Sequence, residues 1–187
     1  GRPRAASLKI LNPFRAGHFR DDKDAVLDVR AEDEGGREFQ IEMQMRTFSE
    51  LPQRILHNWC SLYLAHLQKG DSYTLLKPLI SVWILDRQLF ADDSWLHVFE
   101  LRDLGTGLVL HNDLTIVTIE LEQWACLMEN ALKSTLKVGV GRWLHFLRTA
   151  QDIDPDEPPA EFESEEFKEA LEIMAAFTKS EARRDLY

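Results

Sequence analysis

Residues 28–44, DVRAEDEGGREFQIEMQ, consist of two short arms in which apolar and polar residues alternate, separated by Gly35-Gly36. A period of two is typical of β-strands, because successive side chains of a strand point to opposite faces. Paired glycines at this point supply the positive φ that a tight hairpin turn requires. The stretch therefore predicts a β-hairpin.

The register of this hairpin brings two carboxylates together. With the turn centred near Gly35, the residue numbers of paired positions sum to about 70, so Asp28 is predicted to lie opposite Glu42. Opposed residues have Cβ atoms roughly 4.5–5.5 Å apart, and two carboxylates there repel each other unless a cation lies between them. Mg²⁺ prefers one or two carboxylates together with water and phosphate oxygens. A second interpretation stays open, in which the face is solvated and Arg30 or Arg37 neutralises both acids.

The spacing of the motif adds a second signal. Asp28 is followed, after thirteen residues, by Glu42-Met43-Gln44. This pattern resembles the PD-(D/E)XK nuclease family transposases, also called recombination-promoting nucleases, which carry an Asp on one strand and Glu-x-Gln, or in many relatives Glu-x-Lys, on the next. The resemblance covers roughly residues 8–187, with further family-like segments at 11–13, 54–63, 69–78, 80–86, 97–101 and 143–147.

The resemblance implies a function and a site. It implies a restriction-endonuclease-like α/β fold, with a mixed β-sheet flanked by helices and a helical C-terminal part. It implies a metal-dependent DNA endonuclease that hydrolyses phosphodiester bonds, with Asp28, Glu42 and Gln44 as catalytic residues. The cofactor is then Mg²⁺ or Mn²⁺, and its ligands are the carboxylates of Asp28 and Glu42 and the backbone carbonyl of Met43.

Gln44 departs from the lysine of many relatives, in which this position orients or activates the attacking water. A neutral glutamine cannot act as a base or carry positive charge, but its amide oxygen can hold the water and its NH₂ group the phosphate. We therefore expect slower and strictly metal-dependent cleavage. An ordinary polar residue on an exposed face is the other interpretation of Gln44.

Two further expectations concern activity. Family members usually begin with a helical segment bearing an Asp and a Phe-Lys pair, which this chain lacks, so we expect a fragment or a natural truncation. A non-enzymatic alternative also stays open, in which an inactive remnant of the fold serves as a DNA- or protein-interaction module with Asp28 and Glu42 merely solvated. We find no Ser/His/Asp order, Cys/His pair or nucleotide-binding loop that would indicate another class of enzyme.

Composition places the chain in a broad class. Its 187 residues suit a single domain, and 44% are hydrophobic, enough for a sizeable core. No stretch approaches the roughly 18 apolar residues of a membrane span, and no signal peptide opens the chain. Cys60 and Cys126 stand alone, which suits a reducing compartment. We therefore predict a cytoplasmic protein without a membrane partner, and leave a homodimer open.

The net charge of −10 is unevenly distributed. Residues 1–70 hold 11 basic and 10 acidic residues, whereas residues 151–187 hold 4 and 12. DNA binding usually rests on a basic patch that releases counterions, and here the patch is modest, so we expect weak, salt-sensitive binding to DNA. Its members are Arg2, Arg4, Lys9, Arg15 and Arg20, with Arg46 and Arg54 near the motif.

The rest of the chain predicts one nuclease-like domain, residues 1–151, and an acidic helical extension, residues 152–187. An apolar stripe indicates a helix that begins near Glu50, is capped by Ser49 and closes at Gly70. The continuous apolar run at 79–85 predicts a buried central strand. We also predict strands at 95–101 and 114–121, helices at 122–133 and 139–151, and a helical hairpin over 161–184.

Overall fold

The computed structural model describes residues 5–11, 27–45, 47–128, 139–154 and 156–172. The chain forms two compact units, Gly1–Trp124 and Ala125–Tyr187. The first unit is built on a β-sheet and the second on an aromatic cluster. The domain boundary after residue 151 stays a prediction, and α4 (Val140–Thr149) belongs to the second compact unit.

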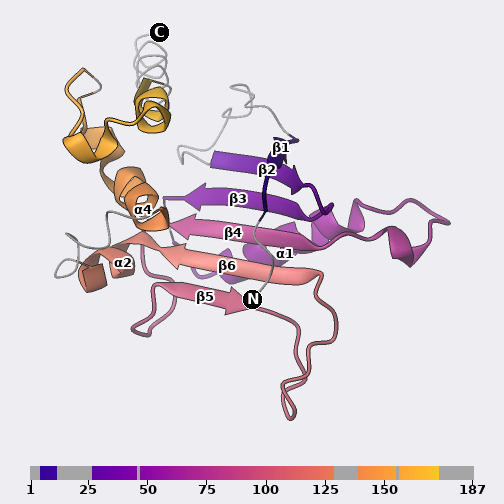
Figure 1. The fold of residues 1–187 in the computed structure, drawn as a ribbon. Coiled ribbons are helices and arrows are strands. Elements are labelled where there is room, and N and C mark those ends of the chain that lie inside the picture. The colour runs from indigo at the N-terminus through magenta and orange to yellow at the C-terminus, as the bar shows by residue number, and fades with distance from the viewer. Residues whose placement is uncertain (1–4, 12–26, 46, 129–138, 155, 173–187) are drawn as a thin grey trace, which may run out of the picture. The chain divides into compact units, whose positions relative to one another are not determined.

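The first unit contains a six-stranded sheet in the order β1-β2-β3-β4-β6-β5 (Figure 1). The pairs β3–β4 and β4–β6 are parallel, whereas the three remaining pairs are antiparallel. The sheet is therefore mixed, as predicted. The strands are β1 Leu8–Ile10, β2 Leu27–Asp33, β3 Glu38–Gln44, β4 Leu79–Leu85, β5 Leu96–Phe99 and β6 Leu114–Glu120.

The β2–β3 hairpin confirms the predicted register, since Asp28 pairs directly with Glu42. The positive φ of the turn falls at Gly36, at +77°. The Asp33 carboxylate closes the turn, because its Oδ1 accepts hydrogen bonds from the backbone N–H groups of Gly35 and Arg37 at 2.9 and 2.8 Å. Burial acts to raise the pKa of Asp33, but the hydrogen bonds from Arg37 and Gly35 outweigh it and lower that pKa below its usual value.

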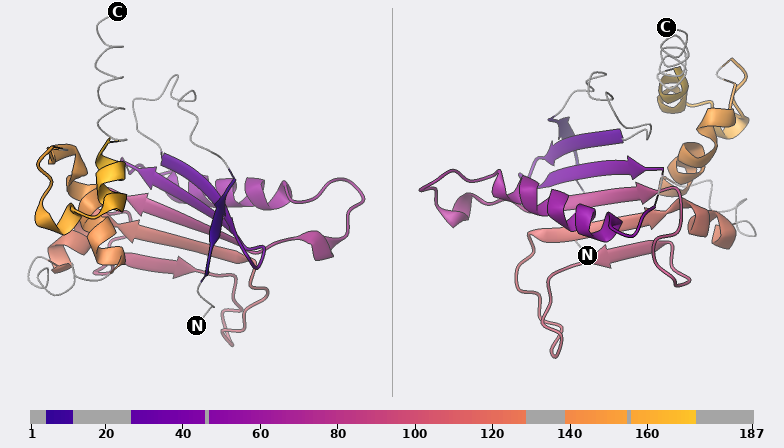
Figure 2. Two further views of the ribbon diagram at one scale, coloured as in Figure 1. Left: turned by 45° about the horizontal axis from the view of Figure 1, so that its top comes forward. Right: turned by 180° about the vertical axis from the view of Figure 1, so that it is seen from behind.

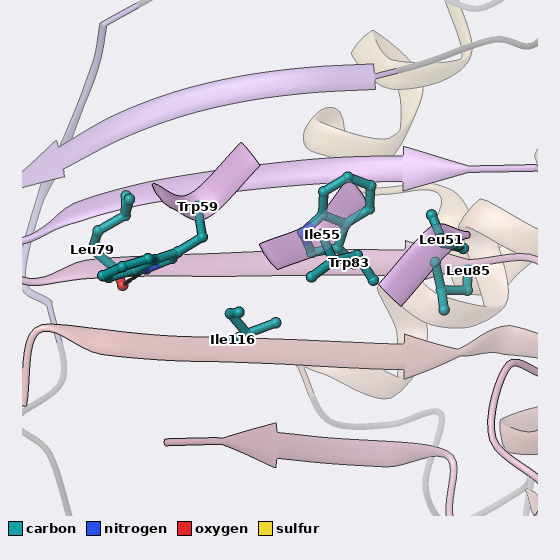
Figure 3. Packing of buried hydrophobic residues seen from close by; sticks show 7 residues of the cluster. All are labelled: Leu51, Ile55, Trp59, Leu79, Trp83, Leu85 and Ile116. Atoms are coloured by element: carbon teal, nitrogen blue, oxygen red, sulfur yellow. Dashed lines mark hydrogen bonds between the residues drawn. The ribbon is translucent and has the colours of Figure 1, made fainter. Parts of the chain in front are cut away.

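Helix α1 (Leu51–Leu64) crosses one face of the sheet, as the right-hand view of Figure 2 shows. The predicted apolar stripe forms its buried side, and the Trp59 indole N–H donates to the Leu79 carbonyl at 3.0 Å. This packing fixes the helix above β4 and β6. The cluster, drawn in Figure 3, consists of Leu51, Ile55, Trp59, Leu79, Trp83, Leu85 and Ile116.

The predicted start of this helix near Glu50 is confirmed, whereas the predicted Ser49 cap and the predicted end are wrong. The N-cap is Glu50, without a side-chain cap, and the Ser49 hydroxyl instead donates to the Glu50 carboxylate. The helix ends six residues before Gly70, which does have a positive φ of +99°. Gly70 serves a separate turn, in which the N–H of Gln68 donates to the Asp71 carboxylate at 2.8 Å. Local side-chain hydrogen bonds thus replace further helical turns.

The other predicted elements up to residue 128 are present with shifted bounds. The strand predicted at 95–101 is β5, four residues long, and the strand predicted at 114–121 is β6. The helix predicted at 122–133 is α2 (Leu121–Met128), and its remaining predicted residues lie outside the described part of the chain. Within the residues described, no helix is long and apolar enough to cross a membrane.

The second unit has its own core. α4 contributes Phe146, which contacts Phe162 and Phe167 with ring centroids 5.4 and 5.0 Å apart. Leu171, in a helical stretch at 165–172, completes the cluster. The predicted helical hairpin continues beyond residue 172, where it lies outside the described residues.

Candidate functional site

The polar side of β3 is its buried side. On an amphipathic hairpin the charged residues usually face water, which was the alternative interpretation of this stretch. The structure contradicts that interpretation for β3, because residues after and within α1 reach this side of the strand. Glu38, Gln40, Glu42 and Gln44 are only 7, 4, 4 and 1% exposed, whereas Phe39, Ile41 and Met43 are half-buried.

Glu42 is held by amide groups from two elements. Its Oε1 accepts a hydrogen bond from the Gln40 side-chain amide, two residues earlier on β3. The same oxygen accepts from Asn58 Nδ2, on α1, at 3.1 Å. A buried carboxylate requires such donors, because burying an unpaired charge is very costly. Glu42 is therefore a desolvated acid with a fixed orientation, not a solvated surface residue.

Asp28 lies at the predicted place in the backbone. It pairs with Glu42 across the antiparallel ladder, and directly opposed positions share one face of a sheet. Position 28 therefore lies on the same face as Glu42. The Asp28 side chain lies outside the described part of the structure.

Gln44, the last residue of β3, is almost completely buried. Its side-chain Oε1 has no hydrogen-bond partner among the described residues. A buried amide oxygen left unpaired costs roughly 1–3 kcal/mol, so such an atom indicates a water or a ligand. The exposed-face interpretation of Gln44 is therefore wrong. Met43, beside it, is half-buried and pairs with Leu27 and Ile84 in the two flanking strands.

The donor set suits a hard divalent cation. Two carboxylates and a backbone carbonyl are oxygen ligands, which Mg²⁺ and Mn²⁺ prefer to nitrogen or sulfur. Across the part of the chain that the structure describes, no group of three or more His, Cys, Asp or Glu side chains is placed to hold a metal. Of the two predicted carboxylate ligands, only Glu42 has a described side chain.

Sequence reasoning missed the residues that hold Glu42. Ser81 Oγ donates to Gln40 Oε1 at 2.9 Å, and the Trp83 indole N–H donates to Ser81 Oγ at 2.9 Å. Gln40 could have been found, since it lies two residues before Glu42 on one face of the strand. Asn58 and Ser81 carried no such signal, because they come from other elements.

Other charged groups of the hairpin form their own pairs. Glu38 accepts a hydrogen bond from Arg30 at 3.0 Å and lies 3.2 Å from His66 Nε2. Arg37 contacts Asp33 in the turn, with Nε 2.6 Å from Oδ2. The two arginines considered as partners of the Asp28–Glu42 pair thus have carboxylate contacts at Glu38 and Asp33.

A mixed sheet with α1 packed on one face, whose hairpin pairs Asp28 with Glu42 of a Glu-x-Gln motif, defines a restriction-endonuclease-like α/β fold. The model of the PD-(D/E)XK nuclease family transposases matches residues 2–187. The chain therefore belongs to this family, which supports a nuclease-like or transposase-related function. No curated protein and no solved structure matches the chain.

Proposed function

We propose that the protein is a Mg²⁺- or Mn²⁺-dependent DNA endonuclease that hydrolyses phosphodiester bonds. The observation that carries the proposal is the backbone pairing of Asp28 with Glu42, together with the burial of the Glu42 carboxylate. Membership of a nuclease family supports the same chemistry. DNA is the proposed substrate and partner, whereas a homodimer and a cytoplasmic location stay predictions.

In this proposal Asp28, Glu42 and the Met43 carbonyl hold the cation. When bound, the ion supplies an activated water and stabilises negative charge on the phosphate. Glu42 contributes a negative charge in a dry environment, where its attraction for a cation is stronger than in water. The amide donors of Gln40 and Asn58 keep one carboxylate oxygen in place.

Gln44 acts in this proposal as a neutral orienting group. Its Oε1 is buried and without a partner among the described residues, so it is available to accept a hydrogen bond from the attacking water. It cannot remove a proton or neutralise the phosphate, so the cation carries most of the electrostatic stabilisation. This division of roles supports slow cleavage that depends strictly on metal.

A plasmid-nicking assay tests the proposal. Supercoiled DNA is incubated with the protein and Mg²⁺ or Mn²⁺, with EDTA as the metal-free control. We expect nicking that EDTA abolishes, and that Asp28→Asn and Glu42→Gln each reduce at least 100-fold, because each removes a charge from the metal site. Glu38→Gln is the matched control, since it removes a buried carboxylate from the same face and strand.

Two results would contradict the proposal. Nicking by Glu42→Gln at the wild-type rate would place the chemistry elsewhere. Metal-independent DNA binding by a folded wild-type protein that never nicks would instead favour the inactive interaction module.

A further inference from the structure

Gln40 connects the candidate site to the core of the sheet. It lies on the buried side of β3, 4% exposed, and its amide group contacts Glu42 on one side and Ser81 on the other. Ser81 and Trp83 are completely buried on β4, and Gln40 and Ser81 are register partners in the parallel ladder. A continuous chain of polar groups therefore runs from the Trp83 indole to the Glu42 carboxylate.

In this chain of polar groups, the donor and the acceptor of each hydrogen bond follow from the atoms that each side chain carries. An indole N–H can only donate, so Ser81 Oγ must accept from Trp83. The single hydroxyl hydrogen of Ser81 is then directed to Gln40 Oε1, 2.9 Å away. Because the oxygen of the Gln40 amide is engaged by Ser81, its NH₂ group must face Glu42 Oε1. The orientation of the amide is thus set from the core outward.

A glutamine at position 40 satisfies both of its hydrogen-bond partners, Ser81 and Glu42. Its oxygen accepts from Ser81 and its nitrogen donates to Glu42, which neither a methionine nor a glutamate can do together. The second donor to Glu42 Oε1 is Asn58 Nδ2, 3.1 Å away on α1. Donors from a strand and from a helix converge on one oxygen, which leaves the carboxylate little freedom to rotate.

We propose that Gln40 is a positioning residue for Glu42, and that the hydrogen bonds through Ser81 and Gln40 couple the Trp83 indole N–H to the Glu42 side chain. The part of this proposal that concerns metal affinity rests on the proposed function. Gln40 acts on the carboxylate and not on DNA, in the way that outer-shell partners orient a ligand of a metal.

The first test needs no metal. The indole ¹H–¹⁵N signals of Trp83 and Trp59 are assigned by Trp→Phe substitution. Trp59 is the internal control, because its buried indole donates to a backbone carbonyl outside the chain of polar groups. Glu42→Gln should shift the Trp83 signal more than the Trp59 signal.

The same substitution is then made in a Gln40→Met background. There the Trp83 response should be lost, and it should also be lost with Ser81→Ala, which breaks the chain one hydrogen bond further from Glu42. An equal Trp83 shift with and without Gln40, or no shift in the wild-type background, would overturn the inference. Circular dichroism verifies that each variant is folded. The Gln40→Met and Ser81→Ala backgrounds test the same chain of hydrogen bonds at two different links.

The second test measures Mg²⁺ affinity by isothermal titration calorimetry. Gln40→Met should weaken Mg²⁺ binding about 10-fold or more, the usual effect of losing an outer-shell partner. Thr118→Val is the matched control, since Thr118 is buried beside Trp83 on β6 and its hydroxyl has no hydrogen-bond partner among the described residues.

The two tests separate the two proposals. If the wild-type protein binds no Mg²⁺, the proposed metal site fails, while the metal-free shifts still decide the role of Gln40. If the protein binds Mg²⁺ with equal affinity in Gln40→Met and the control, Gln40 does not position Glu42.

Discussion

Tyr63→Phe tests how α1 is held over the candidate site. The Tyr63 hydroxyl donates to Asp113 Oδ2 at 2.6 Å, which ties the last turn of α1 to the residue that precedes β6. The same helix carries Asn58, one of the two donors to Glu42. Burial and the hydrogen bond and charge of Asp113 raise the pKa of Tyr63 from 10 to about 12.

The pKa gives the size of the effect. A shift of two units corresponds to about 3 kcal/mol at most, since one unit is about 1.4 kcal/mol. Tyr63 is only half-buried, and solvent screening reduces the contribution, so we expect Tyr63→Phe to lower the free energy of unfolding by about 1–2 kcal/mol. The folded-state pKa is raised, so this contribution is fully present below pH 10 and is lost as the pH rises through about 12.

Urea unfolding followed by circular dichroism gives the difference at pH 8, and absorbance at 295 nm gives the tyrosine titration. The control is Tyr73→Phe, because Tyr73 is 82% exposed and its hydroxyl can be removed without a change in stability. Equal stability of Tyr63→Phe and wild type at pH 8 would refute the reasoning. So would a titration in which no tyrosine ionises above its ordinary pKa of about 10.

Three further predictions follow from other parts of the chain. Gln44→Lys should retain or raise metal-dependent nicking, whereas Gln44→Ala should lower it at least 10-fold, because alanine has no polar group to hold the water. Equal initial rates of the three proteins on supercoiled DNA would exclude Gln44 from the chemistry. Asp33→Asn should destabilise the hairpin near neutral pH. In urea unfolding, the difference in stability between this variant and the wild type should shrink as the pH falls below about 4, because the lowered pKa of Asp33 means that its ionised form adds its full stability only above that pH. Phe162→Ala should lower the stability of the second unit by about 3–5 kcal/mol in thermal unfolding, since Phe162 is 1% exposed and packs against Phe146 and Phe167. A loss below about 1 kcal/mol would show that this aromatic cluster is not the core of the second unit.

The elements that the sequence predicted well are those determined by local chemistry. The turn residues set the hairpin register, so Asp28 opposite Glu42 could be predicted from the position of the glycines alone. The apolar run at 79–85 could be assigned because a central strand with parallel neighbours on both sides is shielded from water, and none of its seven residues is exposed. The α1 stripe followed from helical spacing in the same way.

The features that could not be predicted depend on distant residues. Tyr63 and Asp113 are 50 residues apart in sequence, and Asn58 and Glu42 are 16 apart, so no local pattern joins them. The predicted end of α1 was wrong for a related reason. Gly70 has the positive φ that suits a helix C-terminus, but it lies in the turn closed by Asp71. Side-chain hydrogen bonds to the backbone decide such ends, and they become visible only in the folded chain.

The least predictable feature was the burial of the polar side of β3, and it coincides with the candidate site. The neighbouring strand β4 carries Leu79, Trp83 and Leu85 at the positions that pair with Glu38, Glu42 and Gln44. These apolar residues show what packing under α1 favours on this face. A buried polar group that is left unpaired on this face costs about 1–3 kcal/mol. Gln44 Oε1 is such a group, since it has no hydrogen-bond partner among the described residues. A fold selected for stability alone would not retain this arrangement, because sequence rules usually fail where a local cost serves function. The conflict between pattern and burial at β3 is therefore what a role of Glu42 and Gln44 in the proposed chemistry would lead us to expect.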